Sequence, residues 1–249
     1  MPEPLARRLA HPCFSQPQDP SCHVWRYMTL PKFVALLQKQ SLFFGRLDRL
    51  SDVHEGSLPR LLAESRAAVI QQNNSLPADA ELSEISRQVR RACYVNCWAL
   101  SSFESEALWR LYTVAGDGVA IRTTYQRLIE PAAHDDDMYV GMIQYIDYET
   151  EWFPDGNVFY PIMHKRRAFA HEQEIRLLKM LYQHVPLNSP CGPLGFPVPV
   201  PLDDLIEEIF VSPYAEDWYA DTVQAVVEQF APTLVPKLRW SKMKSEPLY

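Results

Sequence analysis

The stretch His23–Gly45, HVWRYMTLPKFVALLQKQSLFFG, decides the fold class of this chain. Residues 23–28 have strand composition, and Thr29 can cap a helix that runs to about residue 40 with a proline in its first turn. Residues 41–45 again have strand composition. The stretch therefore predicts a strand, a helix and a second strand. The apolar face of the predicted helix consists of Phe33, Leu36 and Leu37.

The rest of the chain continues to mix helices and strands. Helices are predicted over 58–73, 80–91, 104–112, 161–170 and 215–230. Strands are predicted over 93–100, 119–124, 138–147, 174–180, 206–211 and 233–238. No strand leads into a glycine-rich turn of the GxGxxG or GxxxxGK type, which disfavours a parallel nucleotide-binding sheet. We expect an α+β fold with a mixed, largely antiparallel central sheet, flanking helices and a helical insertion.

One domain is expected to follow a short leader. Residues 1–22 are rich in proline and lack apolar periodicity, which predicts a flexible leader. Residues 23–249 are predicted to form a single α+β domain, with a helical insertion at 57–91. The proline-rich stretch 186–201 is predicted to be a long loop of the kind that often covers a functional site.

Composition and charge exclude several classes of protein. Hydrophobic residues make up 47% of the chain, which is enough for a globular core, and the formal net charge of −7 disfavours binding to an extended nucleic-acid duplex. No apolar run approaches the roughly 20 residues that span a bilayer, and the N-terminus lacks the apolar core of a signal peptide. We therefore expect a cytoplasmic protein without a membrane partner. The five cysteines do not suggest a disulfide framework in such a chain.

Two carboxylates lie two residues apart in the segment His171–Arg176, HEQEIR. If this segment is extended, Glu172 and Glu174 project from one face of a strand edge, where paired carboxylates can divide the roles of base and charge stabiliser. The alternative is a solvated junction in which Arg176 forms an ordinary ion pair. The adjacent cations at 165–167 are either an anion contact or a solvated helix turn.

Aromatic and basic residues occur together on the first two predicted strands. Arg26 and Tyr27 follow Trp25, and Arg46 follows two phenylalanines and a glycine. This mixture suits the stacking of a planar base and the binding of phosphate, although each pair taken alone is more often ordinary core packing with arginines that reach solvent. Ser101 lies at a strand end, but no histidine is linked to it as a base.

No metal site is predicted. The pairs His54-Glu55 and His171-Glu172 lack the HExxH spacing of a zinc-binding helix. The acidic run at 135–137 is typical of a charged loop, with Mg²⁺ as the ligand that it would otherwise suit.

Several short motifs, taken in order, resemble the bacterial family known as domain of unknown function 2971. The matching segments are Phe44–Gly56, Cys97–Ser101, Leu108–Tyr112, Gly118–Ile121, Lys165–Phe169 and Glu172–Arg176. The first segment keeps Asp52, Glu55 and Gly56 of the family's loop but has Ser51 in place of the usual asparagine. The resemblance covers most of residues 23–215.

A second resemblance is to the ADP-ribosyltransferases, which are NAD-using glycosyltransferases with a Glu-x-Glu motif. It implies that Glu174 is catalytic, stabilising an oxocarbenium-like transition state, and that Glu172 orients the acceptor. The Ser-Thr-Ser middle motif of these enzymes is missing here. The candidate contacts to NAD are Arg26, Tyr27, Arg46, Ser101, Ser102, Trp109 and Tyr112.

Three functions are therefore expected, in order of preference. The first is a NAD-using ADP-ribosyltransferase-like enzyme with a protein or nucleic-acid acceptor, acting as a toxin in bacterial conflict or phage defence. The second is a non-catalytic module that binds a nucleotide or a partner protein. The third is a metal-dependent hydrolase or nuclease whose carboxylates are Asp52, Glu55, Glu172 and Glu174.

Overall fold

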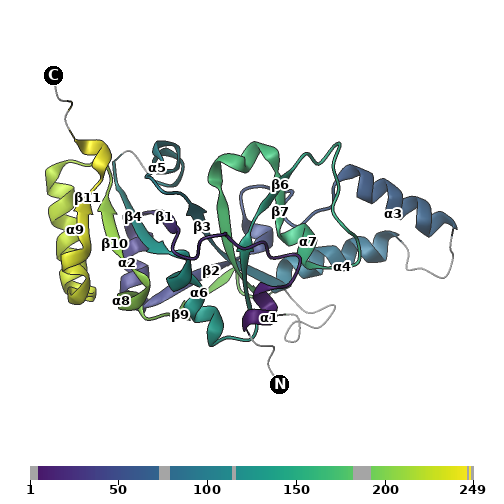
Figure 1. Ribbon diagram of the computed structural model, residues 1–249, viewed down its shortest axis with the longest axis horizontal. Helices are drawn as coiled ribbons and strands as arrows, with labels where there is room; N and C mark the ends of the chain where they lie inside the picture. Colours follow the sequence, from purple (N-terminus) through teal and green to yellow (C-terminus); the bar gives the residue numbers. More distant parts are fainter. Residues whose placement is uncertain (1–4, 73–78, 114–115, 182–191, 246, 248–249) are drawn as a thin grey trace. The chain divides into compact units, whose positions relative to one another are not determined.

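Strands and helices mix along the whole chain in the computed structural model (Figure 1). The strands form a mixed, largely antiparallel central sheet flanked by helices, so the predicted α+β class is confirmed. No helix among the described residues is long and apolar enough to cross a lipid bilayer. The structure describes residues 5–72, 79–113, 116–181, 192–245 and 247.

The chain divides into two compact units, each assembled from segments that are distant in sequence. Unit 1 comprises Met1–Gln16, Phe44–Asn96 and Ala132–Phe196. Unit 2 comprises Pro17–Phe43, Cys97–Pro131 and Pro197–Tyr249. The Glu-x-Glu segment belongs to unit 1, whereas most of the strand-helix-strand opening belongs to unit 2. The prediction of one domain over 23–249 stays a prediction.

The strands of unit 2 lie around β1 (His23–Thr29). This strand pairs antiparallel with β4 (Gly118–Thr124) on one side and with the last residues of β3 (Cys93–Leu100) on the other. β4 in turn pairs antiparallel with β10 (Glu208–Val211), and β10 pairs parallel with β11 (Leu238–Trp240). This last pair makes the sheet mixed.

The helices of unit 2 bury the faces that the sequence predicts. Helix α2 (Leu30–Lys39) follows Thr29 with a proline in its first turn and buries Phe33, Leu36 and Leu37, as predicted. It contacts β1, β4 and α9 (Asp217–Phe230). The remaining helices that lie wholly in this unit are α5 (Glu106–Tyr112), α8 (Leu202–Leu205), η4 (Pro232–Lys237) and η5 (Lys242–Lys244), while α6 (Tyr125–Ala133) begins in it.

Aromatic side chains dominate the core between the unit 2 strands and α5. Trp25, Tyr27, Trp109 and Phe210 are buried together, and the rings of Tyr27 and Trp109 meet edge to face at a centroid distance of 5.0 Å. Buried aromatic pairs of this geometry stabilise a fold beyond their apolar area. α5 is therefore held on β1 by its own tryptophan.

The strands of unit 1 form two groups. β5 (Met138–Met142) pairs antiparallel with β8 (Glu174–Met180), and β8 pairs with β3, whose first residues pair antiparallel with the end of β2 (Ser41–Arg46). A separate parallel pair joins β6 (Gln144–Ile146) to β7 (His164–Arg166). The other short elements are α1 (Leu5–Leu9), η1 (Leu47–Arg49), α7 (Phe159–Ile162), η2 (Arg167–Glu172) and β9 (Gly195–Pro199), of which β9 continues into unit 2.

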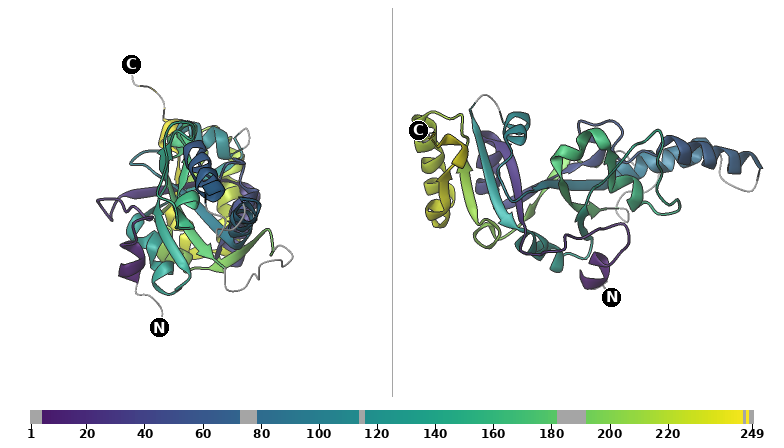
Figure 2. Two further views of the ribbon diagram at one scale, coloured as in Figure 1. Left: turned by 90° about the vertical axis from the view of Figure 1, so that its right-hand side faces the viewer. Right: turned by 45° about the horizontal axis from the view of Figure 1, so that its top comes forward.

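The helical insertion is present in unit 1 as α3 (Arg60–Gln72) and α4 (Asp79–Ala92). α3 extends away from the strands of its unit (Figure 1 and Figure 2) and buries only Leu62 along its length. α4 leads directly into β3. Both helices agree closely with the predicted ranges 58–73 and 80–91. The breaker predicted between them lies mostly outside the described residues.

The predicted helix over 161–170 is wrong. The chain instead forms the end of α7, the strand β7 and the 3₁₀ helix η2 over these residues. Residues 164–166 are extended because they pair with β6 and because Lys165 and Arg166 bind carboxylates from other segments. Tertiary contacts thus override the local helix propensity of this basic, alanine-containing stretch.

The last predicted strand, 233–238, is displaced along the chain. Residues 232–237 form η4 and the strand β11 begins only at Leu238. Pro232 and Pro236 fix φ and lack an N–H for a sheet ladder, which explains the delay. The helix α6 was not predicted, and of the expected loop 186–201 residues 195–199 form β9 while 186–191 lie outside the described residues.

Residues 5–16, expected to belong to a flexible leader, pack within unit 1. Phe14 is buried and its ring lies 5.1 Å from Tyr139 and 5.0 Å from Phe159, centroid to centroid. Arg8 is also buried and donates to the carbonyl of Ala132. Burial of the apolar Phe14 side chain stabilises the packed position of this segment, even though the segment is rich in proline.

Candidate carboxylate site

Three glutamates of unit 1 converge on one lysine ammonium. Lys165 Nζ lies 2.9 Å from Glu55 Oε1, 2.7 Å from Glu172 Oε2 and 2.9 Å from Glu174 Oε2. Glu55, Glu174 and Lys165 are buried, whereas the Glu172 side chain keeps 13% of its exposure. An ammonium has three N–H donors and no acceptor, so its geometry matches three carboxylate oxygens.

A second cation completes the group. Arg176 is fully buried and donates from Nε to Glu174 Oε1 at 2.6 Å. Its two terminal nitrogens each lie 3.1 Å from Glu55 Oε2, and Nη1 also donates to the carbonyl of Ile162. We call Glu55, Lys165, Glu172, Glu174 and Arg176 the carboxylate cluster. Its formal charge is −1 when all five side chains are ionised.

Local backbone geometry brings the two predicted glutamates together. Glu172 ends η2, Glu174 begins β8, and Gln173 between them has the left-handed angles φ 43° and ψ 49°. The two carboxylates therefore meet through a tight turn, and not through the alternation of an extended strand that the sequence suggested. A non-glycine residue in this region is uncommon and is held by its surroundings. Here the backbone N–H of Glu174 donates to the Tyr145 hydroxyl at 2.8 Å.

The aromatic ring of Phe169 lies beside two cations, Lys165 of the cluster and the neighbouring Arg166. The half-buried ring of Phe169 has Lys165 Nζ 5.3 Å and the Arg166 guanidinium carbon 5.5 Å from its centroid. Both distances are within the range of cation–π attraction. Phe169, Arg166 and Glu172 are thus partly exposed beside the buried members of the cluster.

Asp52 lies beside the cluster but binds a different cation. Arg166 donates to both Asp52 oxygens, from Nη2 at 2.7 Å and from Nε at 3.2 Å. Burial acts to raise the pKa of Asp52, but the hydrogen bonds from Arg166 and from the His54 N–H outweigh it and hold the pKa below its usual range. Asp52 is therefore a charged structural partner at neutral pH.

Three of the four carboxylates named for the metal-dependent alternative meet, but around an ammonium. Glu55, Glu172 and Glu174 share Lys165, while Asp52 is bound by Arg166. In the part of the chain that the structure describes, no group of three or more His, Cys, Asp or Glu side chains has the arrangement of a metal site.

The other predicted contact residues are distributed over both units. Arg46, in unit 1, is buried and pairs with Asp48 at 2.6 Å and with the carbonyl of Gly192. The remaining six lie in unit 2, where Tyr27 and Trp109 are in contact as part of the aromatic core. These six are Arg26, Tyr27, Ser101, Ser102, Trp109 and Tyr112.

The polar groups of these unit 2 residues mostly bind the protein itself. The Tyr27 hydroxyl accepts from the Ser105 N–H at 2.8 Å, and Ser101 Oγ donates to the carbonyl of Phe103 at 2.7 Å. Ser102 is exposed, and Tyr112 keeps 44% of its exposure. Tyr27 and Ser101 thus have structural partners that a ligand would have to complement or replace.

Arg26 differs from its neighbours. Its Nη1 is buried and has no hydrogen-bond acceptor among the described residues. The guanidinium carbon lies 6.0 Å from the centroid of the Trp98 ring, and burial lowers the pKa of Arg26 to about 10. Of the predicted anion contacts, Arg26 is the one that has no carboxylate partner in the part of the chain that the structure describes.

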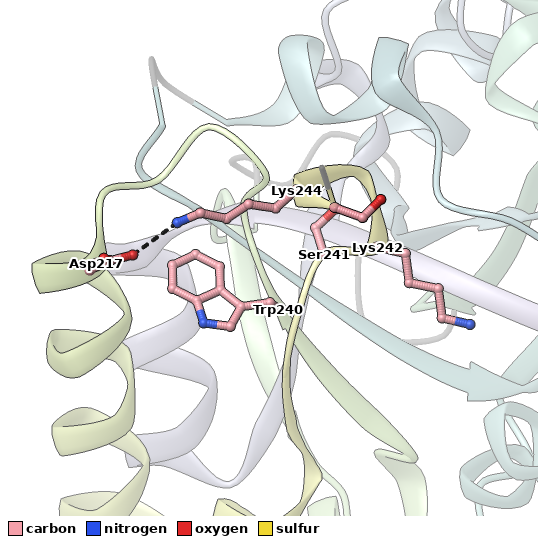
Figure 3. Close-up of a pocket in the computed structure, with 6 residues that line it drawn as sticks. Asp217, Trp240, Ser241, Lys242 and Lys244 are labelled. Carbon is pink, nitrogen blue, oxygen red and sulfur yellow. Dashed lines mark hydrogen bonds and ion pairs between the residues drawn. The ribbon is translucent and has the colours of Figure 1, made fainter. Parts of the chain in front are cut away.

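Unit 2 also contains an open cavity of about 360 Å³ beside its C-terminal strand (Figure 3). Lys244 Nζ lies over the Trp240 ring, 3.5 Å from its centroid, and 3.1 Å from Asp217 Oδ1. None of the predicted site residues lines this cavity. The lining residues are Asp217, Trp240, Ser241, Lys242, Lys244 and Ser245.

The sequence singles out three of the five cluster members, Glu172 and Glu174 as the Glu-x-Glu pair and Glu55 as a carboxylate of the metal-dependent alternative, but not the roles of Lys165 and Arg176. Lys165 was expected to bind an anion or to lie on a solvated helix turn, and Arg176 to form an ordinary exposed pair. The available signal was the order of the motifs, since Glu55, Lys165 and Arg176 each belong to a segment that resembles domain of unknown function 2971.

Comparisons of the chain with models of protein families, with curated proteins and with solved structures found no match. The resemblances to domain of unknown function 2971 and to the ADP-ribosyltransferases stay predictions.

Proposed function

We propose that the carboxylate cluster is the catalytic centre of a NAD-using, ADP-ribosyltransferase-like enzyme. The observation that carries the proposal is the convergence of Glu172 and Glu174 on Lys165 Nζ, at 2.7 and 2.9 Å. These are the two glutamates that the Glu-x-Glu resemblance implies. Glu172 reaches solvent, and Phe169 offers an aromatic face for a planar nicotinamide ring.

In the proposed reaction the bond between ribose C1′ and the nicotinamide nitrogen breaks. The leaving nicotinamide takes the bonding electron pair, and positive charge develops on the ribose. A lone pair of the acceptor then forms the new bond to C1′, and the acceptor loses a proton to Glu172. Glu174 stays ionised and stabilises the oxocarbenium-like charge. Atoms and charges balance for water, a protein side chain or a nucleic-acid group as acceptor.

The cluster has the preorganisation that such electrostatic work requires. Arg176 donates a hydrogen bond to one oxygen of Glu174 and Lys165 donates one to the other, so the carboxylate does not have to reorient when charge develops. The net charge of −1 favours a cationic group next to the cluster, which suits both the nicotinamide ring of NAD and the developing oxocarbenium.

Release of free nicotinamide tests the proposal. We expect the full chain to release nicotinamide from NAD, and Glu174→Gln to reduce the rate by about a hundredfold or more, as for loss of other transition-state charge stabilisers. Glu172→Gln should reduce transfer to an acceptor more than hydrolysis. Glu149→Gln is the matched control, because Glu149 belongs to the same unit and its side chain is 70% exposed.

Thermal unfolding of each variant separates loss of activity from loss of folding. Absence of nicotinamide release by the wild-type chain, or an unchanged rate in folded Glu174→Gln, overturns the proposal. In bacterial cells, induced wild-type protein should arrest growth while Glu174→Gln does not, as expected for a toxin of bacterial conflict or phage defence.

One observation favours a second candidate, a non-catalytic nucleotide-binding or protein-binding module. Both oxygens of Glu174 are engaged, one by Arg176 and one by Lys165, so the buried carboxylate has a structural role whether or not it is catalytic. Isothermal titration with NAD distinguishes the two functions. Heat of binding without release of nicotinamide supports the module.

A further inference from the structure

We propose that Lys165 is the positioning residue of this active site, whose ammonium holds Glu172 and Glu174 in one arrangement. This inference rests on the proposed function and deepens it. Lys165 is carried by β7, outside the Glu-x-Glu segment, and its side chain keeps only 7% of its exposure. Burial of an unpaired charge is costly, and Lys165 is accordingly surrounded by carboxylates.

Lys165 relieves the electrostatic repulsion among three carboxylates. Its Nζ lies 2.7 to 2.9 Å from oxygens of Glu55, Glu172 and Glu174, so these oxygens surround a single point. Carboxylates that share a site without a cation cannot all stay ionised, and at least one takes up a proton. Arg176 binds Glu55 through Nη1 and Glu174 through Nε.

Glu174 binds a second cation as well as Lys165. Without Lys165, Glu174 keeps its 2.6 Å hydrogen bond from Arg176, while Glu172 loses its 2.7 Å hydrogen bond from Lys165 Nζ. We therefore expect removal of Lys165 to affect the step that uses Glu172, activation of the acceptor, more than binding of NAD.

The surroundings contain few other groups that can compensate. Tyr145 faces Lys165 and both glutamates, with its pKa raised by burial, so it stays neutral at physiological pH. Cys93 and Tyr148 face Glu55 and are likewise held neutral by burial. Among the described residues, the charged and titratable groups that face the cluster or belong to it besides its glutamates and Lys165 are Asp52, Arg166, Arg176, Tyr145, Tyr148 and Cys93.

The test compares Lys165→Met, which removes the charge and keeps the apolar stem, with Lys165→Arg, which keeps the charge. The matched control is Arg167→Met, two residues away, because Arg167 is 63% exposed and pairs with Glu151 outside the cluster. Each variant is assayed for nicotinamide release between acid and alkaline pH. The kcat and KM of each variant are determined in parallel.

We expect Lys165→Met to move the acid limb of the pH profile upward by about one pH unit and to lower kcat more than it changes KM. Lys165→Arg should restore much of the wild-type profile, and Arg167→Met should match the wild type.

The outcomes separate the two proposals. If the wild-type chain releases no nicotinamide, the proposed function fails, and the role of Lys165 in it fails with it. If the wild-type chain is active but folded Lys165→Met has an unchanged pH profile and an unchanged kcat, only the role of Lys165 is overturned.

Discussion

Glu55, from the loop after η1, and Lys165, from β7, form a buried ion pair in which Glu55 Oε1 lies 2.9 Å from Lys165 Nζ. The second oxygen of Glu55 binds Arg176, so one glutamate joins the two cations of the carboxylate cluster. A buried charge that loses its partner is more costly than an exposed one, because the remaining charge stays desolvated.

We accordingly expect Glu55→Gln to lower the free energy of unfolding by about 3 to 5 kcal/mol. Glu64→Gln is the matched control, because Glu64 pairs with Arg60 on the exposed face of α3 and should change stability by less than about 1 kcal/mol. Urea unfolding followed by circular dichroism measures both. Equal effects of the two substitutions contradict a buried, charge-balanced cluster.

Acid stability depends on Asp52. Its pKa is held low in the folded protein, so its contribution to stability is present above the unfolded pKa, about 3.9, and is lost as the pH falls through the folded value. Asp52→Asn should therefore cost about 1 to 3 kcal/mol near neutral pH and much less in acid, since hydrogen bonds to charged groups have this strength. Urea unfolding of both proteins at about pH 6 and about pH 3 measures the difference. A cost that is the same at the two values disproves the assignment.

Trp109 is expected to stabilise unit 2 regardless of any ligand. Its side chain is fully buried, packs edge to face on Tyr27 and donates from Nε1 to Glu104 at 3.2 Å. Trp109→Ala should cost about 3 to 5 kcal/mol. Trp218→Ala, at a position that is 63% exposed, should stay within about 0.5 kcal/mol of wild type. Similar melting temperatures for the two variants contradict the packing described for Trp109.

Gly141 tests the packing of residues 5–16. A Cβ at this position would lie 2.9 Å from Phe14 Cα, a backbone atom that cannot move aside cheaply. Gly141→Ala should therefore cost about 1 to 3 kcal/mol, as overpacking does elsewhere. Gly45→Ala is the control in the same unit, because no heavy atom lies within 4 Å of its added Cβ. Limited proteolysis should cut the first sixteen residues faster in Gly141→Ala only, and equal rates contradict the packing of Phe14.

The sequence by itself determined much of the local structure. The spacing of Phe33, Leu36 and Leu37 predicts α2 and its buried face, and the apolar composition of 93–100 and 174–180 predicts β3 and β8. These elements follow from local periodicity, since a helix or strand must place its apolar residues on one side.

Only the tertiary structure decided how the carboxylate cluster is built. The sequence singled out Glu172 and Glu174, but it gave the wrong reason for their proximity and predicted a helix where β7 carries Lys165 into the core. Glu55, Lys165 and Arg176 come from separate elements, so their convergence depends on long-range packing. A buried ion pair between residues this far apart requires the fold to bring both together and to exclude water around them, and no local sequence pattern encodes that condition.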